Sequence, residues 1–362
     1  MNDEQRTINN KPRIIAFEVT NRCRFNCLHC RANALAGGNE ELTTGQCKKI
    51  LSSVARFCKG LKPIIILTGG EPMERGDIYE LIRHGRKLGL RMVMATCGYL
   101  IDDSSIAELK KAGVLALSFS IDGSSAETHD RFRDTKGAFD ATVRAAGIAR
   151  KAGMRFQINT TISKINIDEI TGIVELAKKF GAYCFNAFIL VPTGRGKNIA
   201  DDVLSPLQYE VLLNELLHLK LTSKIEVRVT CGPSFVRLWR QARESSPKKS
   251  RGVIDKQSLI TGEPNGCMGG RGFGFISWRG DVQTCGFLDI SAGNLLENRF
   301  NFGRIWRESK FLNEIRDVSV YKGKCGVCEY VSVCGGCRAR AYATTGDYLA
   351  ADPICKFAKR QS

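Results

Sequence analysis

The sequence has few histidines, no long apolar run and no excess of acidic residues. Only four of its 362 residues are histidine, which leaves little imidazole for acid–base chemistry near neutral pH. No segment approaches the roughly 18 consecutive apolar residues of a membrane span. The polar start, MNDEQRTINNKPR, lacks the apolar centre of a signal peptide. We therefore expect a cytoplasmic protein without a transmembrane segment.

Acidic residues are outnumbered: 54 Lys and Arg against 37 Asp and Glu give a formal net charge of +17. Such a field attracts anions, which include nucleic acid, an acidic membrane face and a small polyanionic substrate. The basic residues are spread along the chain, without the concentrated tail that marks a nucleic-acid arm.

Cysteine, in contrast, is abundant, with 15 residues. The cytosol keeps thiols reduced, so disulfides are not expected there and metal binding is the better interpretation.

Apolar segments alternate with helical patterns through the first half of the chain. The predicted strands are residues 13–20, 63–69, 91–96, 116–122, 155–161 and 183–191. The predicted helices are residues 43–57, 102–113, 137–153 and 168–181. This order predicts an α/β fold with a parallel sheet and right-handed crossovers. Six units instead of eight predict a partial (β/α)6 barrel like an open TIM barrel, with its chemistry at the C-terminal strand ends.

The pattern divides the chain into four parts. We expect a polar tail over residues 1–12, the barrel over 13–199, a bridging segment over 200–264 and a glycine- and cysteine-rich module over 265–362. Within the bridge, the patterns predict an amphipathic helix in 204–219, a strand over 224–230 and a loop over 241–262.

Three cysteines directly follow the first predicted strand in a C-x3-C-x2-C run, Cys23, Cys27 and Cys30. Zinc usually takes four ligands, and the only nearby candidate for a fourth is His29. Three thiolates without an evident fourth ligand suit an iron–sulfur cube with one iron left open.

The second predicted strand ends in TGGEP, which contains Gly69, Gly70 and Glu71. Glycines allow a close approach of the backbone to a ligand, and a carboxylate beside them can hold an ammonium group.

Seven further cysteines mark the last part of the chain. They are Cys267, Cys285, Cys325, Cys328, Cys334, Cys337 and Cys355. Their density excludes ordinary core packing and predicts a metal-stapled module, for which zinc is the structural alternative.

Together these motifs resemble the radical S-adenosylmethionine (SAM) enzymes over residues 13–196. The resemblance implies that Cys23, Cys27 and Cys30 hold a 4Fe–4S cluster whose open iron binds the methionyl part of SAM. It also implies that the segment Gly69–Glu71 binds the methionyl amine.

The resemblance extends to weaker candidates for the nucleoside part of SAM. In SFSIDG, Ser120 is the candidate for the ribose. Asn159, Leu190 and Val191 on the fifth and sixth strands are candidates for ribose and adenine, with ordinary barrel packing as the alternative.

The C-terminal module is similar to the SPASM extension of these enzymes, which holds two auxiliary iron–sulfur clusters. That similarity implies an outer set formed by Cys325, Cys328, Cys334 and Cys355. It implies an inner set of Cys267, Cys285 and Cys337, for which we predict Cys231 as the fourth ligand; a buried free thiol is the alternative. The spacing departs from the family at Cys334 and Cys337, where C-x2-C replaces C-x3-C.

The remaining cysteines and histidines are interpreted as structural. These cysteines are Cys47, Cys58, Cys97 and Cys184. We expect His29 to pack beside the first cluster, His129 to lie in a loop, and His84 and His218 to lie on helices.

Four segments resemble the tetrapyrrole branch of the family, and most closely its heme synthases. They are HCRA (29–32), VPTGRG (191–196), TCGPSF (230–235) and the stretch 334–355. The resemblance implies oxidative decarboxylation of two propionates of iron-coproporphyrin III to vinyls, giving heme b. Arginines in or near these segments are candidates for the carboxylates of this anionic substrate. They are Arg31, Arg195, Arg271, Arg338 and Arg340, with cluster support or a surface position as the alternative.

Such a reaction requires a low-potential electron donor of the ferredoxin or flavodoxin type and an electron acceptor. Three other functions stay open: modification of a siroheme or heme d1 precursor, modification of a ribosomal peptide, and nucleic-acid binding by a zinc-stapled protein. The peptide function is disfavoured because only a dozen residues precede the first strand. The nucleic-acid function is disfavoured because a small zinc module does not need a barrel.

Overall fold

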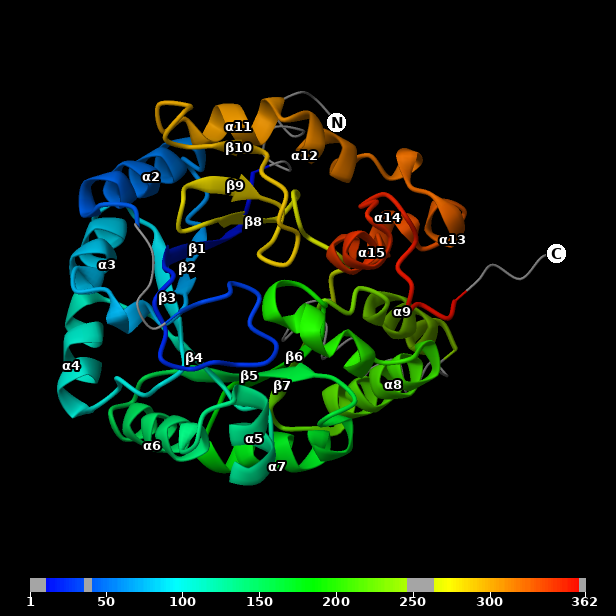
Figure 1. The fold of residues 1–362 in the computed structure, drawn as a ribbon, viewed down its shortest axis with the longest axis horizontal. Helices are drawn as coiled ribbons and strands as arrows, with labels where there is room; N and C mark the ends of the chain where they lie inside the picture. The colour runs from blue at the N-terminus through cyan, green and yellow to red at the C-terminus, as the bar shows by residue number, and fades with distance from the viewer. Residues whose placement is uncertain (1–10, 36–40, 246–263, 358–362) are drawn as a thin grey trace.

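The computed structural model describes residues 11–35, 41–245 and 264–357. Within them, one ten-stranded sheet has the order β10-β9-β8-β1-β2-β3-β4-β5-β6-β7 (Figure 1). Its strands are β1 (Ile14–Thr20), β2 (Ile64–Gly69), β3 (Arg91–Thr96), β4 (Leu117–Ser120), β5 (Phe156–Ile162), β6 (Cys184–Ile189), β7 (Glu226–Thr230), β8 (Phe273–Ile276), β9 (Asp281–Gln283) and β10 (Gly293–Asn294).

The six predicted barrel strands form and pair in parallel in chain order, from β1 with β2 to β5 with β6. The α/β partial barrel is therefore confirmed, but its sheet is larger than expected. Strand β7, predicted in the bridging segment, pairs in parallel with β6. Strand β8, from the C-terminal part, pairs in parallel with β1 and continues into an antiparallel hairpin with β9.

Helices surround the strands as an outer ring in Figure 1. In the first half these are α2 (Thr44–Phe57), α3 (Ile78–Lys87), α4 (Asp103–Ala112), α5 (Ala126–Arg133), α6 (Ala138–Lys151) and α7 (Ile170–Phe180). The predicted signals set their ends: Thr43 and Asp102 cap α2 and α4 with their side chains, and Gly113 and Gly181 end α4 and α7 in the left-handed conformation.

Two helices in this first half were not predicted. Helix α3 follows the TGGEP segment, and α5 contains His129, which we expected in a loop. Ser125 starts α5 by accepting a hydrogen bond from the backbone N–H of Thr128. The helix is short and mostly polar, so its sequence carries only a weak apolar period.

The second half of the chain adds helices beside the sheet. They are α8 (Pro206–Thr222), α9 (Phe235–Ser245), α11 (Phe302–Glu308), α12 (Lys310–Arg316), α13 (Gly323–Gly326), α14 (Val331–Cys334) and α15 (Arg338–Thr345). The amphipathic helix predicted in 204–219 is α8. Residues 241–245 of the predicted loop belong to α9, and the rest of that loop lies outside the described residues, as does most of the predicted N-terminal tail.

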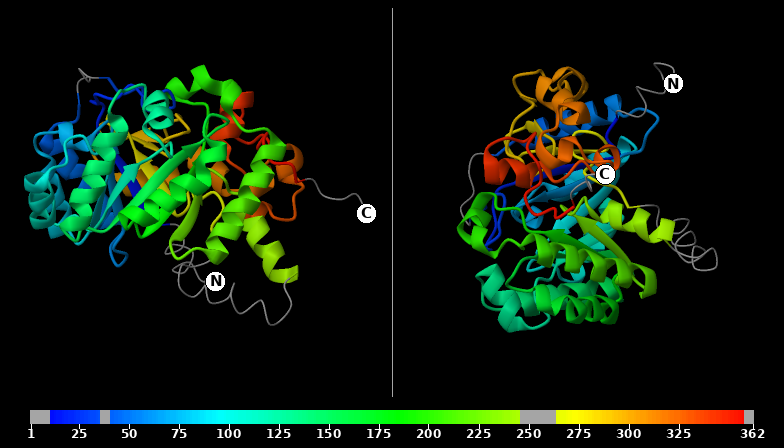
Figure 2. Two further views of the ribbon diagram at one scale, coloured as in Figure 1. Left: turned by 90° about the horizontal axis from the view of Figure 1, so that it is seen from below. Right: turned by 90° about the vertical axis from the view of Figure 1, so that its right-hand side faces the viewer.

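The C-terminal module is joined to the barrel on two sides. Helix α14 packs against α9, and α11 packs against α2, an arrangement visible in Figures 1 and 2. The backbone N–H of Phe302 donates to the hydroxyl of Ser53 at 3.0 Å across the second of these contacts. No helix in the described ranges has the length and apolar character that crossing a bilayer requires.

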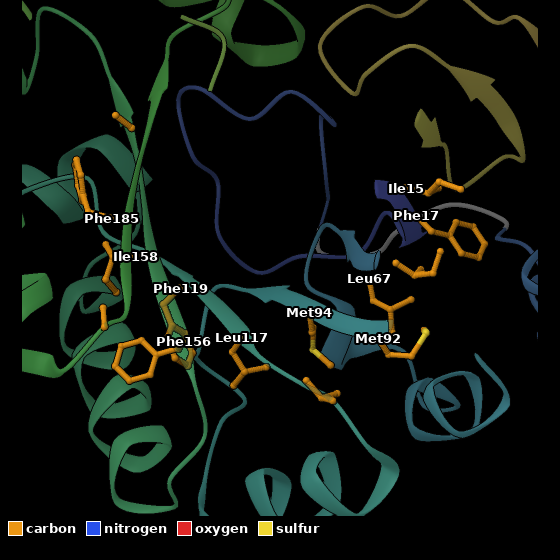
Figure 3. Packing of buried hydrophobic residues seen from close by; sticks show 14 of the residues in the cluster. Ile15, Phe17, Leu67, Met92, Met94, Leu117, Phe119, Phe156, Ile158 and Phe185 are labelled. Carbon is orange, nitrogen blue, oxygen red and sulfur yellow. The ribbon is translucent and has the colours of Figure 1, made fainter. Parts of the chain in front are cut away.

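Apolar side chains from alternate strand positions fill the space between sheet and helices. Figure 3 shows Phe17, Leu67, Met94 and Phe119 among them, and each of these four side chains is at most 1% exposed. Burying one such side chain contributes about 1.5–3 kcal/mol. Since successive strand residues point to opposite faces, the polar residue Glu18 of β1 projects to the other face, inside the barrel.

Candidate active site

The loop that follows β1 carries the three predicted ligands. Cys23 and Cys27 are buried, Cys30 is half-buried, and all three are free thiols. They pack in one small group with Phe25 and Cys97. Burial raises the pKa of the Cys27 thiol to about 11. Three free thiols on one short loop match the donor set of a 4Fe–4S cluster with an open iron.

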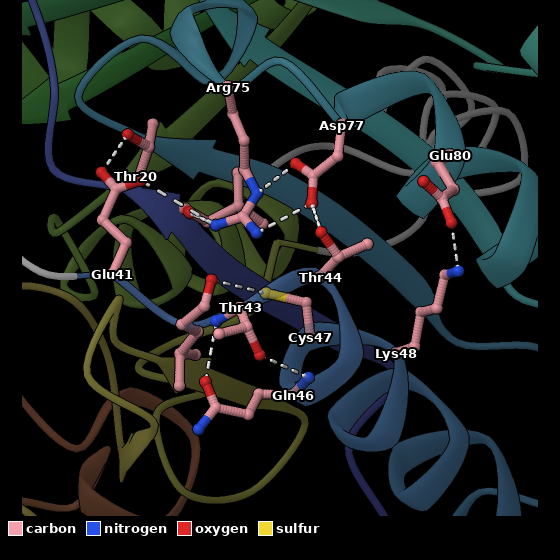
Figure 4. A network of polar contacts seen from close by, with 12 residues as sticks. Thr20, Glu41, Thr43, Thr44, Gln46, Cys47, Lys48, Arg75, Asp77 and Glu80 are labelled. Atoms are coloured by element: carbon pink, nitrogen blue, oxygen red, sulfur yellow. Dashed lines mark hydrogen bonds and ion pairs between the residues drawn. The ribbon is translucent and has the colours of Figure 1, made fainter.

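The strand end that leads into this loop is anchored by a polar network (Figure 4). The guanidinium of Arg75 donates to the carbonyl of Val19 at 2.8 Å and is paired with Asp77. The carboxylate of Glu41 accepts from the backbone N–H of Asn21 at 2.8 Å and also accepts from Thr20. These contacts fix where the cysteine loop begins.

Gly69 and Gly70 are required by the close approach of the TGGEP segment to the same loop. A Cβ atom on Gly69 would lie 2.2 Å from the carbonyl oxygen of Thr20, and one on Gly70 would lie 2.1 Å from that of Arg22. In the native chain, the N–H of Gly70 donates to Thr20 and that of Glu71 donates to Arg22, at 3.0 and 2.7 Å. The predicted SAM segment and the cysteine loop are therefore closely packed and hydrogen-bonded to each other.

The carboxylate of Glu71 is fully buried. It accepts hydrogen bonds from the Thr96 hydroxyl at 2.8 and 2.9 Å, the Cys97 N–H at 2.6 Å and the Met73 N–H at 3.1 Å. Burial raises the pKa of Glu71 to about 7, while these hydrogen bonds oppose the shift. The carboxylate thus joins the ends of β2 and β3, a role that the sequence did not reveal.

Cys97, which we interpreted as structural, lies beside the predicted ligand Cys23. A hydrogen bond between the two thiols is the largest cause that lowers the pKa of Cys23, to about 6. The other cysteines read as structural fit that interpretation: burial raises the pKa of Cys47 and Cys184 to about 12 and that of Cys58 to about 11.

The VPTGRG segment, which follows β6, lies against the cysteine loop. Arg195 donates from Nε to the carbonyl of Cys27 at 3.0 Å and from Nη1 to that of Ala34 at 2.8 Å. A Cβ atom on Gly194 would lie 2.4 Å from the carbonyl oxygen of Cys30. Arg195 therefore holds the loop, which corresponds to the cluster-support alternative for this residue.

The nucleoside candidates lie along the neighbouring strands. Ser120 ends β4 and is the register partner of Asn159 on β5, so the structure brings these two together. Leu190 and Val191 follow β6 and are each 2% exposed. Val191 packs with Cys337 of the C-terminal module.

A buried charged group, missed in the sequence, lies behind the cysteine loop. Asp122 and His129 are fully buried, and Arg133 is 7% exposed. Arg133 is paired with Asp122, with 2.5 Å between Nη2 and Oδ2, and donates from Nη1 to the Cys27 sulfur at 3.5 Å. His29, which we expect beside the first cluster, stacks on Phe132 with ring centroids 4.4 Å apart.

The four thiols of the predicted inner set, Cys231 included, are neighbours. The interaction between the Cys231 and Cys337 thiols is the largest cause that raises the pKa of Cys231 and lowers that of Cys337, to about 7. Cys337 also interacts electrostatically with Cys267, and Cys267 interacts with Cys285. Cys231 adopts a φ of 58°, a conformation that a residue with a side chain rarely takes. These relationships fit Cys231 as the fourth member of the inner set.

The predicted outer set forms a second neighbourhood. Cys355 interacts electrostatically with both Cys328 and Cys334, and each of these interacts with Cys325. The sulfur of Cys325 also accepts from the Asp352 N–H at 3.4 Å. No group of three or more Cys, His, Asp or Glu side chains is arranged to hold a single metal ion in the ranges that the structure covers. The cluster sites are thus inferred from donor chemistry and neighbourhood.

Two of the arginines predicted to meet substrate are buried in the module. Arg338 is 2% exposed and donates to the carbonyls of Tyr348 and Ala350 at 3.1 and 2.6 Å. Arg340 is fully buried and paired with Asp352 at 3.2 Å. Donors of both side chains are used by protein groups, which for Arg340 include the carbonyl of Cys231 after β7, so the predicted contact with substrate carboxylates does not fit them.

The other two candidates are more accessible. Arg31, with its side chain 19% exposed, pairs with Glu18 at 2.9 Å and lies over the ring of Phe275. Arg271 is half-buried and donates to the carbonyl of Arg316 at 3.2 Å.

A partial barrel with a three-cysteine loop after β1 and a glycine-rich β2 end defines a radical SAM enzyme. A family model described as the radical SAM superfamily matches residues 17–177. The fold is shared with the crystal structure of SuiB from Streptococcus suis bound to its precursor peptide, with a TM-score of 0.73, 18% identity and coverage of 98% of this chain and 78% of that one.

Two relatives extend over nearly the whole chain. It is 45% identical over 347 residues to an AdoMet-dependent heme synthase of Methanosarcina barkeri, covering 96% of this chain and 97% of that protein. It is 40% identical over 351 residues to an AdoMet-dependent heme synthase of Nitratidesulfovibrio vulgaris, covering 96% and 93%. The chain belongs to the AdoMet-dependent heme synthase family of radical SAM enzymes.

Proposed function

We propose that this enzyme converts two propionates of iron-coproporphyrin III to vinyl groups, giving heme b. The observation that carries the proposal is the 45% identity, over 96% of the chain, to a protein named for heme synthesis. A more distant relative, 30% identical over 370 residues, is named Fe-coproporphyrin III synthase, which also concerns a tetrapyrrole.

The first iron–sulfur cluster and SAM are assigned to residues of the barrel. Cys23, Cys27 and Cys30 are proposed to hold the 4Fe–4S cluster, and the segment Gly69, Gly70 and Glu71 to receive the methionyl amine. Because Glu71 is fully buried, its carboxylate must exchange one of its present hydrogen bonds for that contact. When bound, cluster and SAM supply a 5′-deoxyadenosyl radical that removes a hydrogen atom from substrate. Ser120 and Asn159, which are register partners, are proposed for the ribose, and Leu190 and Val191 line the adenine side.

The C-terminal thiols are proposed to hold two auxiliary clusters in a SPASM-like module. Loss of carbon dioxide from a propionate radical leaves one electron to be removed, and a cluster with four protein thiolates can accept it without binding substrate. We place the set of Cys231, Cys267, Cys285 and Cys337 nearer the substrate, because Cys337 packs with Val191 at the end of β6. A low-potential donor of the ferredoxin or flavodoxin type and an electron acceptor complete the reaction.

The substrate is a polyanion, which suits the net charge of +17. Of the arginines considered, Arg31 and Arg271 remain the proposed partners of its carboxylates, since Arg338 and Arg340 are buried and Arg195 holds the cysteine loop. The reaction is proposed to take place in the cytoplasm.

Anaerobic incubation with SAM, a strong reductant and iron-coproporphyrin III tests the function. Mass analysis should find the loss of two carboxyl groups and the formation of heme b, with 5′-deoxyadenosine as co-product. Replacing Cys23, Cys27 or Cys30 by Ala should abolish both products. Unchanged iron-coproporphyrin III alongside conversion of a siroheme-derived porphyrin would assign the enzyme to another tetrapyrrole.

A further inference from the structure

Helix α5 ends directly against the cysteine loop. The backbone N–H of Leu28 donates to the carbonyl of Phe132 at 3.1 Å. The amide of Asn26 donates to the carboxylate of Asp134 at 2.6 Å. The C-terminal end of α5 is therefore fixed relative to the three thiols, and so is the residue between Phe132 and Asp134.

That residue is Arg133, whose guanidinium is held from both sides. Its Nη2 is paired with Asp122 at 2.5 Å, and Asp122 itself accepts from the backbone N–H of Thr161 at 2.7 Å. Its Nη1 donates to the sulfur of Cys27 at 3.5 Å. The Nε of Arg133 is buried without a hydrogen-bond partner in the ranges that the structure covers, and a sulfide of a bound cluster is an acceptor of suitable charge.

The position of this charge bears on electron transfer. A 4Fe–4S core with three thiolates carries a charge of about −1, and about −2 after one-electron reduction. Hydrogen bonds to the cluster sulfurs and nearby charges set the potential of such a centre. A buried cation in contact with a ligand sulfur favours the reduced, more negative state.

We propose that Arg133 is a positioning residue for the reducing step: through Cys27 it raises the reduction potential of the SAM-binding cluster, and Asp122 holds it there. The step adds one electron, supplied by the low-potential donor, to the oxidised cluster and breaks no bond. The inference rests on the proposed cluster at Cys23, Cys27 and Cys30.

The ion pair gives a signed test. Arg133→Gln removes the near positive charge and leaves Asp122 negative, so the potential should fall. Asp122→Asn removes the farther negative charge, so the potential should rise. The double variant removes both charges and should lie between wild type and Arg133→Gln. It also avoids an unpaired buried charge, so it remains measurable if Arg133→Gln fails to fold.

The measurement is an anaerobic redox titration followed by electron paramagnetic resonance, with iron counting of each variant. The signal of the SAM-binding cluster is identified by its change on addition of SAM and its absence in Cys23→Ala. We expect the ratio of reduced to oxidised cluster at fixed potential to fall at least tenfold in Arg133→Gln, a shift of about 59 mV for one electron. Arg133→Lys, which keeps the charge, should recover part of this shift.

Arg131→Gln is the matched control, because Arg131 is an exposed arginine on the same helix; it should titrate like wild type. Iron-loaded Arg133→Gln or double variant with the wild-type potential would overturn the inference and leave the proposed function intact. If instead the SAM-sensitive signal persists in Cys23→Ala, the cluster assignment itself fails.

Discussion

Arg340 and Asp352 form an ion pair that solvent does not reach, with 3.2 Å between Nη1 and Oδ2 and 0% exposure of both side chains. Asp352 also accepts from the backbone N–H of Cys337 at 2.9 Å, and Arg340 donates to the carbonyl of Cys231 at 2.8 Å. The pair therefore joins the backbones of two thiols proposed for the inner cluster, although one follows β7 and the other precedes α15.

Replacing Asp352 by Asn should destabilise the C-terminal module. Breaking a buried pair leaves an unpaired charge and costs about 3–5 kcal/mol, and here it also loosens Cys337. Anaerobic denaturant unfolding should show this loss, together with fewer irons per chain. Asp347→Asn is the control: Asp347 pairs with Lys322 at a more exposed position, where ion pairs contribute little. Equal stability of the two variants would contradict the prediction.

Two substitutions of Cys231 can separate its proposed role as a cluster ligand from its effect on backbone stability. Its φ of 58° costs a residue with a side chain about 1–2 kcal/mol relative to glycine. Cys231→Gly should therefore stabilise the cluster-free protein slightly, while removing one ligand of the inner cluster. Cys231→Ala removes the ligand without relieving the backbone.

Iron counting and Mössbauer spectroscopy measure the loss of the ligand in both Cys231 variants. Unfolding of the cluster-free proteins measures the difference in stability between them. Full iron content in both would show that Cys231 is only a buried thiol.

Motifs formed by neighbours in the chain were predictable, since spacing alone brings Cys23 and Cys27 together and Gly69 and Gly70 precede a turn. The strands were predictable for a similar reason, because each is one short apolar run. Contacts between distant segments were not. Arg340 pairs with Asp352, so it does not have the substrate-binding role that we expected. The sequence near either residue does not indicate this pairing.

Arg133 was missed for a related reason. It lies in α5, a short polar helix in which a buried arginine and an exposed one, such as Arg131, look alike in the sequence. Likewise β8 pairs with β1, the first strand of the sheet, although β8 lies in the C-terminal part of the chain. Only the packing of the whole chain selects these partners.

Glu71 should make SAM binding depend on pH. Its pKa is raised from 4.5 to about 7 by burial. Between about pH 4.5 and 7 the folded protein therefore holds a proton that the unfolded chain has lost, so this group's contribution to stability falls as pH rises. The SAM ammonium favours the carboxylate, so SAM affinity should increase up to about pH 7, with proton release below it.

Calorimetry in buffers of different ionisation enthalpy measures that release. Glu71→Gln should weaken SAM binding about tenfold or more, the loss of one charge-assisted contact of about 1.5–3 kcal/mol, and should abolish the proton release at unchanged iron content. Glu74→Gln, in the same turn, is the control. Equal affinity and equal proton release in Glu71→Gln and wild type would remove Glu71 from the SAM site.

The outer cluster is predicted to relay the electron that vinyl formation releases. Cys328 is its most suitable probe, because it is half-buried and interacts with Cys325 and Cys355. Cys328→Ala should leave 5′-deoxyadenosine formation largely intact but stall vinyl formation, since the propionate radical cannot lose carbon dioxide without giving up an electron. Loss of a stapling cluster can also unfold its module, so circular dichroism and iron counting accompany the assay. A folded variant that lacks only this cluster and still makes heme at the wild-type rate would assign the cluster a structural role instead.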